Sequence, residues 1–397
     1  MRTVIVTLTF LLSLNSLNAA SFVYQDGRVI KDSTGKEIKL KGVNIGGWLL
    51  WEGWIWGGGL TRESKIAEGL EKIGGTAEFK AFRKDIYKNY FSEADVKAIS
   101  EAGMNVIRIP FNHRIFDPAY CEPGGFTVLD SVLFWCKKYG VYAVLDLHAA
   151  PGGQNPLFIS DPEKNNLWKD EKHRIQTVKL WESIALRYRN NAVIAGYDLL
   201  NEPYNPGKKG NEALVHFYDT LIHSIRKIDS LHMLIIEGNN YAKDFDFFTK
   251  TPDNNMMFEF HLYNFLGGNP EDKLREYLKL GERLDVPVWC GEWGENNYDM
   301  LQKTLNAFAA AENEMSGWCF WTWKKVLSGN PALNSIPYTA SWLELIKWCS
   351  TQSPSKMPSH DNAAAAMADF GKSVRYAATT HDDRLMQMLK NNIQQKH

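Results

Sequence analysis

The stretch Val193-Ile-Ala-Gly-Tyr-Asp-Leu-Leu200 is followed directly by Asn201-Glu-Pro203, so an apolar strand is expected to end in a polar turn. The same arrangement recurs along the chain, and we predict eight strands: Leu40 to Asn44, Val106 to Pro110, Tyr142 to Leu147, Val193 to Leu200, Met233 to Glu237, Met257 to His261, Val288 to Gly291 and Gly317 to Trp321. Amphipathic stretches with helical periodicity separate them, for example Ser92 to Ala102 and Glu212 to Asp229. Eight parallel strands alternating with helices close most naturally into a (β/α)8 barrel, the TIM barrel.

Composition excludes several classes of protein. The 397 residues carry 45 Lys and Arg against 46 Asp and Glu, and a formal net charge of -1 does not favour a nucleic acid as partner. The hydrophobic fraction of 44% is sufficient for one large core, which excludes a disordered chain. The 14 Trp, 16 Tyr and 20 Phe exceed what a core needs, and surplus aromatic rings often form surfaces on which sugar rings stack.

The chain is expected to have three parts. Residues 1–19 combine Arg2 with an apolar run and a small-residue exit, which predicts a signal peptide and export. The apolar run is shorter than a membrane span requires, and the alternative of a membrane anchor is the less favoured one. Residues 20–350 form the predicted barrel, which begins with a hairpin over Phe22 to Ile30 that closes one end. Residues 351–397 are expected to form extra helices on the barrel of a monomeric protein.

Five cysteines are an odd number with wide spacing, so at least one thiol is expected to be free: Cys121, Cys136, Cys290, Cys319 and Cys349. They contain no C-x-x-C pair, and we predict neither a metal site nor a cofactor.

Two of the predicted strands deliver a glutamate at the carboxyl end, where catalytic residues of such barrels lie. These are Leu199-Leu-Asn-Glu-Pro203 and Val288-Trp-Cys-Gly-Glu-Trp293. Hydrolysis of a glycosidic bond needs two carboxyl groups, one to protonate the leaving oxygen and one to act as nucleophile or to activate water. Strands four and seven lie across the barrel mouth, so a separation of about 5 Å is expected, as in enzymes that retain anomeric configuration.

Several strand-end motifs together resemble glycoside hydrolase family 5, the cellulase-like branch of the Asn-Glu barrel clan. They are Ile107-Arg-Ile-Pro110, Leu147-His148, Asn201-Glu-Pro203, His261-Leu-Tyr263, Gly291-Glu292 and Trp321. The resemblance covers roughly residues 38 to 345. It implies that Glu202 is the acid/base and Glu292 the nucleophile. It also implies supporting roles for Arg108, His148, Asn201, His261 and Tyr263. An acid of this kind needs a raised pKa, which we expect for Glu202.

Some of these residues have alternative interpretations. Arg108 could form an ion pair with Asp146, and His148 could be a core histidine with satisfied hydrogen bonds. Glu237, which also ends a strand, is expected to contact a sugar subsite or to form an ion pair.

Aromatic residues are expected to line the substrate site. Trp321 is the predicted platform beneath the sugar at the cleavage point. One or two of the tryptophans between Asn44 and Trp56 are expected to line further subsites, with Trp293 as another candidate. Trp48, Trp51 and Trp54 are the members of that loop that we assign to substrate binding.

The leading functional hypothesis is a secreted, retaining β-glycoside hydrolase that cleaves β-glucan as an endo-β-1,4-glucanase. An exo-β-1,3-glucanase or β-glucosidase of the same family is the first alternative, and a mannan or glycolipid hydrolase is the next. A barrel that binds a glycan without cleaving it belongs to another class, although such a protein has no need to keep both Glu202 and Glu292.

Overall fold

A closed barrel of eight parallel strands forms the centre of the protein. The computed structural model describes residues 21–395, apart from 165, 266 and 327–330. The strands follow the chain around the barrel: β4 (Leu40–Asn44), β5 (Val106–Asn112), β6 (Tyr142–Ala149), β7 (Ile194–Asp198), β8 (Met233–Glu237), β9 (Met256–Tyr263), β10 (Val288–Gly294) and β11 (Gly317–Phe320). The predicted (β/α)8 fold and all eight strands are confirmed, with ends that differ by at most three residues.

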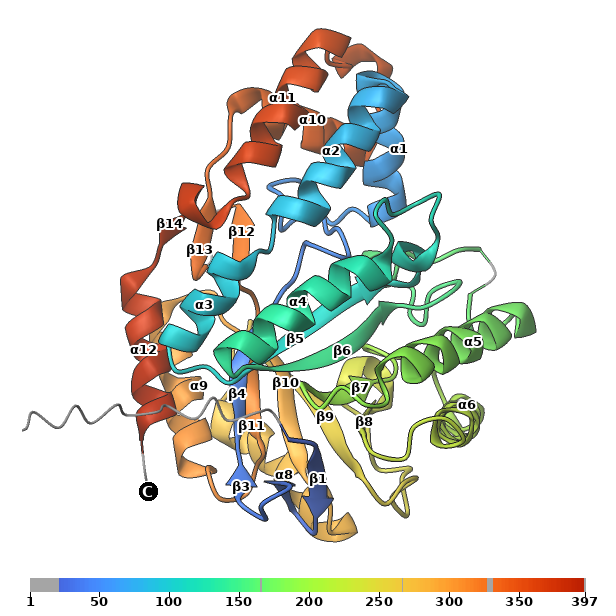
Figure 1. The fold of residues 1–397 in the computed structure, drawn as a ribbon, viewed down its shortest axis with the longest axis vertical. Helices are drawn as coiled ribbons and strands as arrows, with labels where there is room; N and C mark the ends of the chain where they lie inside the picture. The colour runs from blue at the N-terminus through green and yellow to red at the C-terminus, as the bar shows by residue number, and fades with distance from the viewer. Residues whose placement is uncertain (1–20, 165, 266, 327–330, 396–397) are drawn as a thin grey trace, which may run out of the picture.

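Helices surround the barrel, and their amphipathic faces cover the strands (Figure 1). Those of the barrel region are α1 (Glu63–Gly74), α2 (Thr76–Asn89), α3 (Glu93–Glu101), α4 (Gly125–Tyr139), α5 (Glu171–Tyr188), α6 (Lys208–Arg226), α7 (Asn239–Ala242), α8 (Pro270–Leu284) and α9 (Tyr298–Ala310). Helix α3 begins with the expected capping box, in which the side chain of each of Ser92 and Asp95 accepts a hydrogen bond from the backbone N–H of the other.

An antiparallel hairpin closes the end of the barrel at which the strands begin. It consists of β1 (Val23–Asp26) and β2 (Val29–Asp32), and β3 (Glu37–Ile38) extends it to a sheet of three strands. Val23 and Ile30 are buried in one cluster with residues from the first half of the barrel strands, such as Leu40 and Met233. The hairpin therefore leaves only the opposite end, where the strands finish, open for a functional site.

The C-terminal part of the chain packs on the barrel. Helices α10 (Ala340–Thr351) and α11 (His360–Ser373) stand beside α1 and α2, and α12 (Asp383–Gln394) lies against α9 (Figure 1). A small sheet of β12 (Lys324–Val326), β13 (Asn334–Ile336) and β14 (Thr380–His381) joins this part to the end of β11.

Three expectations concern the rest of the chain. The predicted signal peptide, residues 1–19, lies outside the described residues. All five cysteines are buried and free, in agreement with the expectation of at least one free thiol. Within the described ranges no helix has both the length and the hydropathy needed to cross a bilayer.

Gly291 on β10 lies where the barrel interior has no space for a side chain. A Cβ atom at this position would lie 1.6 Å from Oε1 of the buried Glu259 on β9. We expect Gly291→Ala to lower the free energy of unfolding by at least about 2 kcal/mol, because neither the strand nor the carboxylate has space to move. Urea unfolding measures this difference. Gly59→Ala is the matched control, since its nearest neighbour would be 3.6 Å away. Equal stability of the two variants would contradict the packing described here.

Candidate active site

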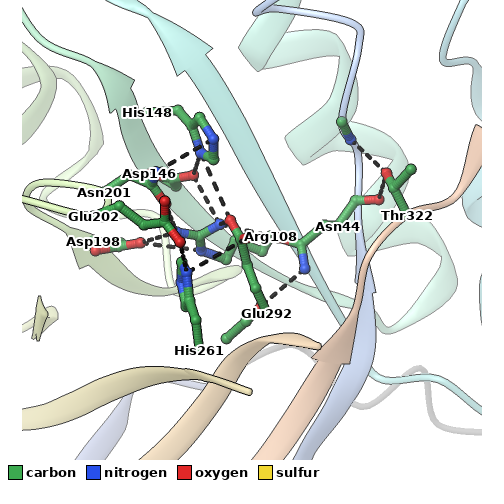
Figure 2. A network of polar contacts seen from close by, with 12 residues as sticks. Asn44, Arg108, Asp146, His148, Asp198, Asn201, Glu202, His261, Glu292 and Thr322 are labelled. Carbon is green, nitrogen blue, oxygen red and sulfur yellow. Dashed lines mark hydrogen bonds and ion pairs between the residues drawn. The ribbon is translucent and has the colours of Figure 1, made fainter. Parts of the chain in front are cut away.

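A single guanidinium group organises the polar residues at the carboxyl ends of the strands (Figure 2). Arg108 on β5 is fully buried, and five carboxylates lie within 3.1 Å of its nitrogen atoms: those of Asp146, Asp198, Glu237, Glu259 and Glu292. Burial alone would lower the pKa of Arg108, but the surrounding negative charges outweigh it and raise that pKa well above its ordinary value. Arg108 therefore makes both contacts that we considered for it, the ion pair with Asp146 and the contact with Glu292.

The two predicted catalytic carboxylates meet at this mouth. One oxygen of Glu202, one of Glu292 and a ring nitrogen of His261 all lie within 4.8 Å of one another. Glu292 accepts hydrogen bonds from Arg108 Nη1 at 2.7 Å and from the Tyr263 hydroxyl at 3.0 Å. These two donors fix the position of the carboxylate group, as the predicted role of nucleophile requires.

Glu202 has a different environment from the one we expected. Burial acts to raise the pKa of Glu202, but a 2.7 Å hydrogen bond from His261 Nδ1 and the positive charge of this imidazole outweigh it, so the pKa lies below its ordinary value. The pKa of His261 is in turn raised well above 6.5, since the surrounding carboxylates outweigh its burial. The prediction of a raised pKa for Glu202 is therefore wrong for this structure, because the proton of the pair resides on His261.

His148 and Asn201 hold fixed positions beside the carboxylates. His148 Nδ1 lies 2.7 Å from Asp146 Oδ2, and burial lowers the pKa of this histidine to about 4, so that it is neutral. Arg108 Nη2 donates to the amide oxygen of Asn201 at 2.8 Å. Trp321 is partly exposed and stacks on His148 with 5.4 Å between ring centroids, as a platform beside the carboxylates would require. His148 therefore has the features of both interpretations: it is buried with partners for its ring nitrogens, as a core histidine is, and it lies beside Glu292 and Trp321.

The remaining acids around Arg108 form a support that does not face the solvent. Burial raises the pKa of Asp198 to about 6, of Asp146 to about 7 and of Glu237 to about 8. Glu237 is completely buried, and its Oε2 accepts a hydrogen bond from the backbone N–H of Glu202 at 2.6 Å. The prediction of a substrate-binding role for Glu237 is wrong in this structure: of its two predicted roles the ion pair is present, and the sugar contact is prevented by burial.

Most of the predicted tryptophan subsites are part of the core. Trp48, Trp51 and Trp293 are at most 1% exposed, so the prediction that they bind substrate is wrong. Trp51 packs against Trp56, which is also fully buried, and Trp293 packs against aromatic rings from α9 and β11. Only Trp54 and Trp321 among the predicted set keep part of their surface open. In this protein the glycine-rich aromatic loop between Asn44 and Trp56 thus forms mainly a buried cluster and only to a small extent a binding surface.

One charged residue of that loop was missed from the sequence. Glu52 is 2% exposed, its Oε2 accepts from Trp54 Nε1 at 2.8 Å, and its Oε1 has no hydrogen-bond partner among the described residues. Burial raises its pKa to about 8, and the negative charges of Glu292 and Glu202 add to the increase. A lone acid within Leu-Leu-Trp-Glu-Gly-Trp was the available signal, because a carboxyl group is rarely placed in an apolar loop without a role.

A lysine also contacts the ring of Trp54. The ammonium group of Lys325, on β12, stands over the Trp54 ring at 5.5 Å from its centroid. Burial lowers the pKa of Lys325 to about 8. Glu52 and Lys325 thus place two hydrogen-bonding groups at the β11 and β4 side of the mouth, whereas Glu202 follows β7.

Two trios of side chains are close enough to hold a cation: Glu202, His261 and Glu292, and Glu237, Glu259 and His261. Arg108 already pairs with Glu237, Glu259 and Glu292. The predicted chemistry, which uses two carboxylates, requires no metal ion.

Comparison with known proteins agrees with this geometry. The family described as "Cellulase (glycosyl hydrolase family 5)" matches residues 70–326. A β-xylosidase of Phanerodontia chrysosporium is 32% identical over an aligned length of 346 residues, and the match covers 77% of this chain and 71% of that protein. Endoglucanase C of Acetivibrio thermocellus is 30% identical over 203 residues, and the match covers 49% of this chain and 57% of that enzyme.

The fold is shared with a solved enzyme structure as well. The rutinosidase from Aspergillus niger superposes with a TM-score of 0.59 at 20% identity, covering 74% of this chain and 91% of that one. The predicted family and the prediction of a glycosidase are confirmed. This chain belongs to glycoside hydrolase family 5.

Proposed function

We propose that this protein is an exported, retaining β-glycosidase that removes a single β-linked glucosyl or xylosyl residue from the non-reducing end of its substrate. These two sugars share their ring hydroxyl groups and differ only in the C6 hydroxymethyl group. The approach of Glu202 and Glu292 to within 4.8 Å supports the retaining mechanism, since inverting enzymes separate their carboxyl groups by about 6.5–9.5 Å to admit a water molecule. Export rests on the composition of residues 1–19.

The first half of the reaction follows from the hydrogen bonds of the site. Glu292, held by Arg108 and Tyr263, attacks the anomeric carbon, and the bond from that carbon to the leaving oxygen breaks. Glu202 donates a proton to the leaving oxygen. In the second half Glu202 accepts a proton from water, which attacks the glycosyl ester of Glu292 and releases the sugar with retained configuration.

The proton that Glu202 donates is held by the His261–Glu202 pair. In the free enzyme it resides on His261 Nδ1, 2.7 Å from Glu202 Oε1. Binding of a substrate shields Glu202 from water, which disfavours two separated charges and favours transfer of this proton to the carboxylate. His261 is therefore a positioning residue that sets the protonation state of Glu202.

Removal of one sugar at a time requires a closed end on the glycone side. We assign this closed end to Glu52, Trp54 and Lys325, because they belong to the segments that follow the neighbouring strands β4 and β11, across the mouth from Glu202, which follows β7. Trp54 is the partly exposed member of this group and offers a ring face to a terminal sugar, while Glu52 and Lys325 are buried beside it and hold the ring in place. The similarity to a β-xylosidase over 77% of this chain agrees with this choice.

An endo-acting β-1,4-glucanase is the second candidate, and the similarity to Endoglucanase C favours it. In that case a polysaccharide chain would have to continue past Glu52 and Trp54.

Exchange of the two carboxylates tests the mechanism. We expect Glu292→Gln to lower kcat by on the order of 10⁴-fold or more, because a neutral amide cannot form the glycosyl ester. Glu202→Ala should retain more activity on aryl glycosides with good leaving groups than on disaccharides, and added azide should restore turnover as a β-glycosyl azide product. Substantial activity of Glu292→Gln, or an α-configured azide product, would contradict the assignment.

The pH profile tests the role of His261. Because its folded-state pKa is raised, the proton of the pair is present at neutral pH and is lost only as the pH rises through that pKa. In His261→Asn the proton must be held by Glu202 alone, nearer its ordinary pKa. We expect the alkaline limb of kcat/KM to move to lower pH, with on the order of 10²-fold less activity at pH 7. The exposed His360→Asn serves as the control. An unmoved alkaline limb would show that His261 does not hold this proton.

Product analysis tests the closed end. From β-1,3-linked and β-1,4-linked glucose pentamers and from xylopentaose, the wild-type enzyme should release monosaccharide step by step from one of the three. Glu52→Ala should lower kcat/KM on 4-nitrophenyl monosaccharides at least about tenfold, because the Trp54 ring loses the hydrogen bond that positions it, and disaccharides should appear among the products. Internal cleavage by the wild-type enzyme would reject the exo-acting proposal and favour the endoglucanase.

A further inference from the structure

A buried amide side chain joins the ends of two barrel strands. Gln154 lies in the loop after β6, and its Nε2 atom donates to the carbonyl oxygens of His148 and Asn201, each at 2.7 Å. His148 and Asn201 lie side by side at the mouth (Figure 2). The amide oxygen of Gln154 accepts from the N–H of Ala150 at 3.1 Å, which defines the donor end of the amide. Both hydrogens of Nε2 are therefore engaged at the ends of β6 and β7.

The turn that carries Glu202 is bound by this residue and by the next one. The backbone oxygen of Gln154 accepts from the N–H of Tyr204 at 3.1 Å. The side chain of Asn155 donates to the carbonyl oxygen of Glu202 at 3.0 Å. With the bond from Gln154 to the carbonyl oxygen of Asn201, two consecutive residues hold three backbone groups of the turn. The loop after β6 therefore determines where the turn after β7 lies.

The backbone of Glu202 depends on such support. Its φ of 45° is in the left-handed region, which is unfavourable for a residue other than glycine and persists only where the surrounding structure holds it. Its N–H donates to the buried Glu237 carboxylate at 2.6 Å, and its carbonyl oxygen accepts from Asn155. Asn155 is itself oriented, because its amide oxygen accepts from the N–H of Leu157 at 2.9 Å. Side chains thus bind both backbone polar groups of Glu202.

The loop after β6 is anchored at both ends of its course. Trp168 Nε1 donates to the backbone oxygen of Gln154 at 2.7 Å. Further along the loop, the buried carboxylate of Asp161 accepts from the N–H of Ser64 at 3.2 Å and forms an ion pair with Arg114. The loop is therefore a fixed support against which the turn of Glu202 can be held.

We propose that Gln154 is a positioning residue for proton transfer: by fixing the turn after β7 it directs the Glu202 carboxyl group to the leaving oxygen. This inference rests on the proposed function. A general acid must come within hydrogen-bond reach of its acceptor, and a displacement of about 1 Å can lower a rate about 10²-fold. Glu292 is on β10 and is held by Arg108 and Tyr263, so its attack on the anomeric carbon does not need the Gln154 amide.

Two leaving groups that differ in their need for a proton test this role. The substrates are the phenyl and the 2,4-dinitrophenyl β-glycoside of the same sugar, because both carry one aryl ring but dinitrophenolate leaves without protonation. Gln154→Met keeps the length of the side chain and removes its donors. We expect the ratio of kcat/KM on the phenyl to kcat/KM on the dinitrophenyl compound to fall at least about tenfold. Both values come from one preparation, so their ratio does not depend on the fraction of the variant that folds.

A second amide at the other end of the barrel supplies the matched control. Gln25 Oε1 accepts from the N–H of Met256 at 3.0 Å, and its Nε2 lies 3.4 Å from two carbonyl oxygens. Gln25→Met should keep the wild-type ratio. Asn155→Ala should lower the ratio as Gln154→Met does, because it releases the carbonyl oxygen of Glu202. An unchanged ratio in Gln154→Met, or an equal fall in Gln25→Met, would overturn the inference.

A double variant separates this inference from the proposed function. If Gln154 acts through Glu202, the ratio should be the same in Glu202→Ala and in Glu202→Ala combined with Gln154→Met. A further fall in the double variant would show that Gln154 acts elsewhere and would reject its positioning role. If Glu202→Ala lowers the ratio and Gln154→Met does not, only the role of Gln154 is rejected. If Glu202→Ala leaves the ratio unchanged, the proposed function fails at its acid/base, and the role of Gln154 fails with it.

Discussion

The interaction of Arg108 with its five carboxylates is the constraint on which the site depends. A buried guanidinium is costly unless it is paired, and a buried carboxylate is costly for the same reason. Arg108 draws acids from β6, β7, β8, β9 and β10 to one point at the barrel mouth. Because one of them is Glu292, the group that joins the strand ends also positions the predicted nucleophile. The same ion pairs therefore stabilise the barrel mouth and position the carboxylates that lie there.

The excess of acids over cations then decides where protons reside. Arg108 and His261 are two positive groups facing six carboxyls, since Glu202 adds to the five around Arg108, and full ionisation would leave uncompensated charge in a desolvated space. The structure relieves this by raising the pKa of Asp146, Asp198, Glu237 and Glu259 through burial. The carboxylates that face substrate keep the strongest donors, Arg108 for Glu292 and His261 for Glu202. Arg108 and His261 thus hold the two outer carboxylates in place, while burial raises the pKa of the inner acids.

The sequence predicted the barrel and the meeting of Glu202 and Glu292 at its mouth because both depend on local pattern. Each strand is an apolar run, and a glutamate at its end must point to the mouth of a parallel barrel. Burial of the tryptophans was beyond this reasoning, since Trp51 is enclosed by Phe79 and Phe82 of α2 and Trp293 by Phe308 of α9, contacts made by segments distant in the chain. The pKa of Glu202 was mispredicted for a related reason. Its value depends on a hydrogen bond from His261, 59 residues away, and no spacing in the sequence specifies that distance.

The order of strands around the barrel divides the mouth into two sides with different chemistry. Over β11 and β4, Glu52 and Lys325 are enclosed, and burial shifts the pKa of each to about 8. Over β7 and β8 the groups are aromatic and partly open, as Tyr204 and Tyr241 show. The same carboxylate pair, Glu202 and Glu292, therefore has a buried polar side and a more open aromatic side, because each side is built by loops from different strands.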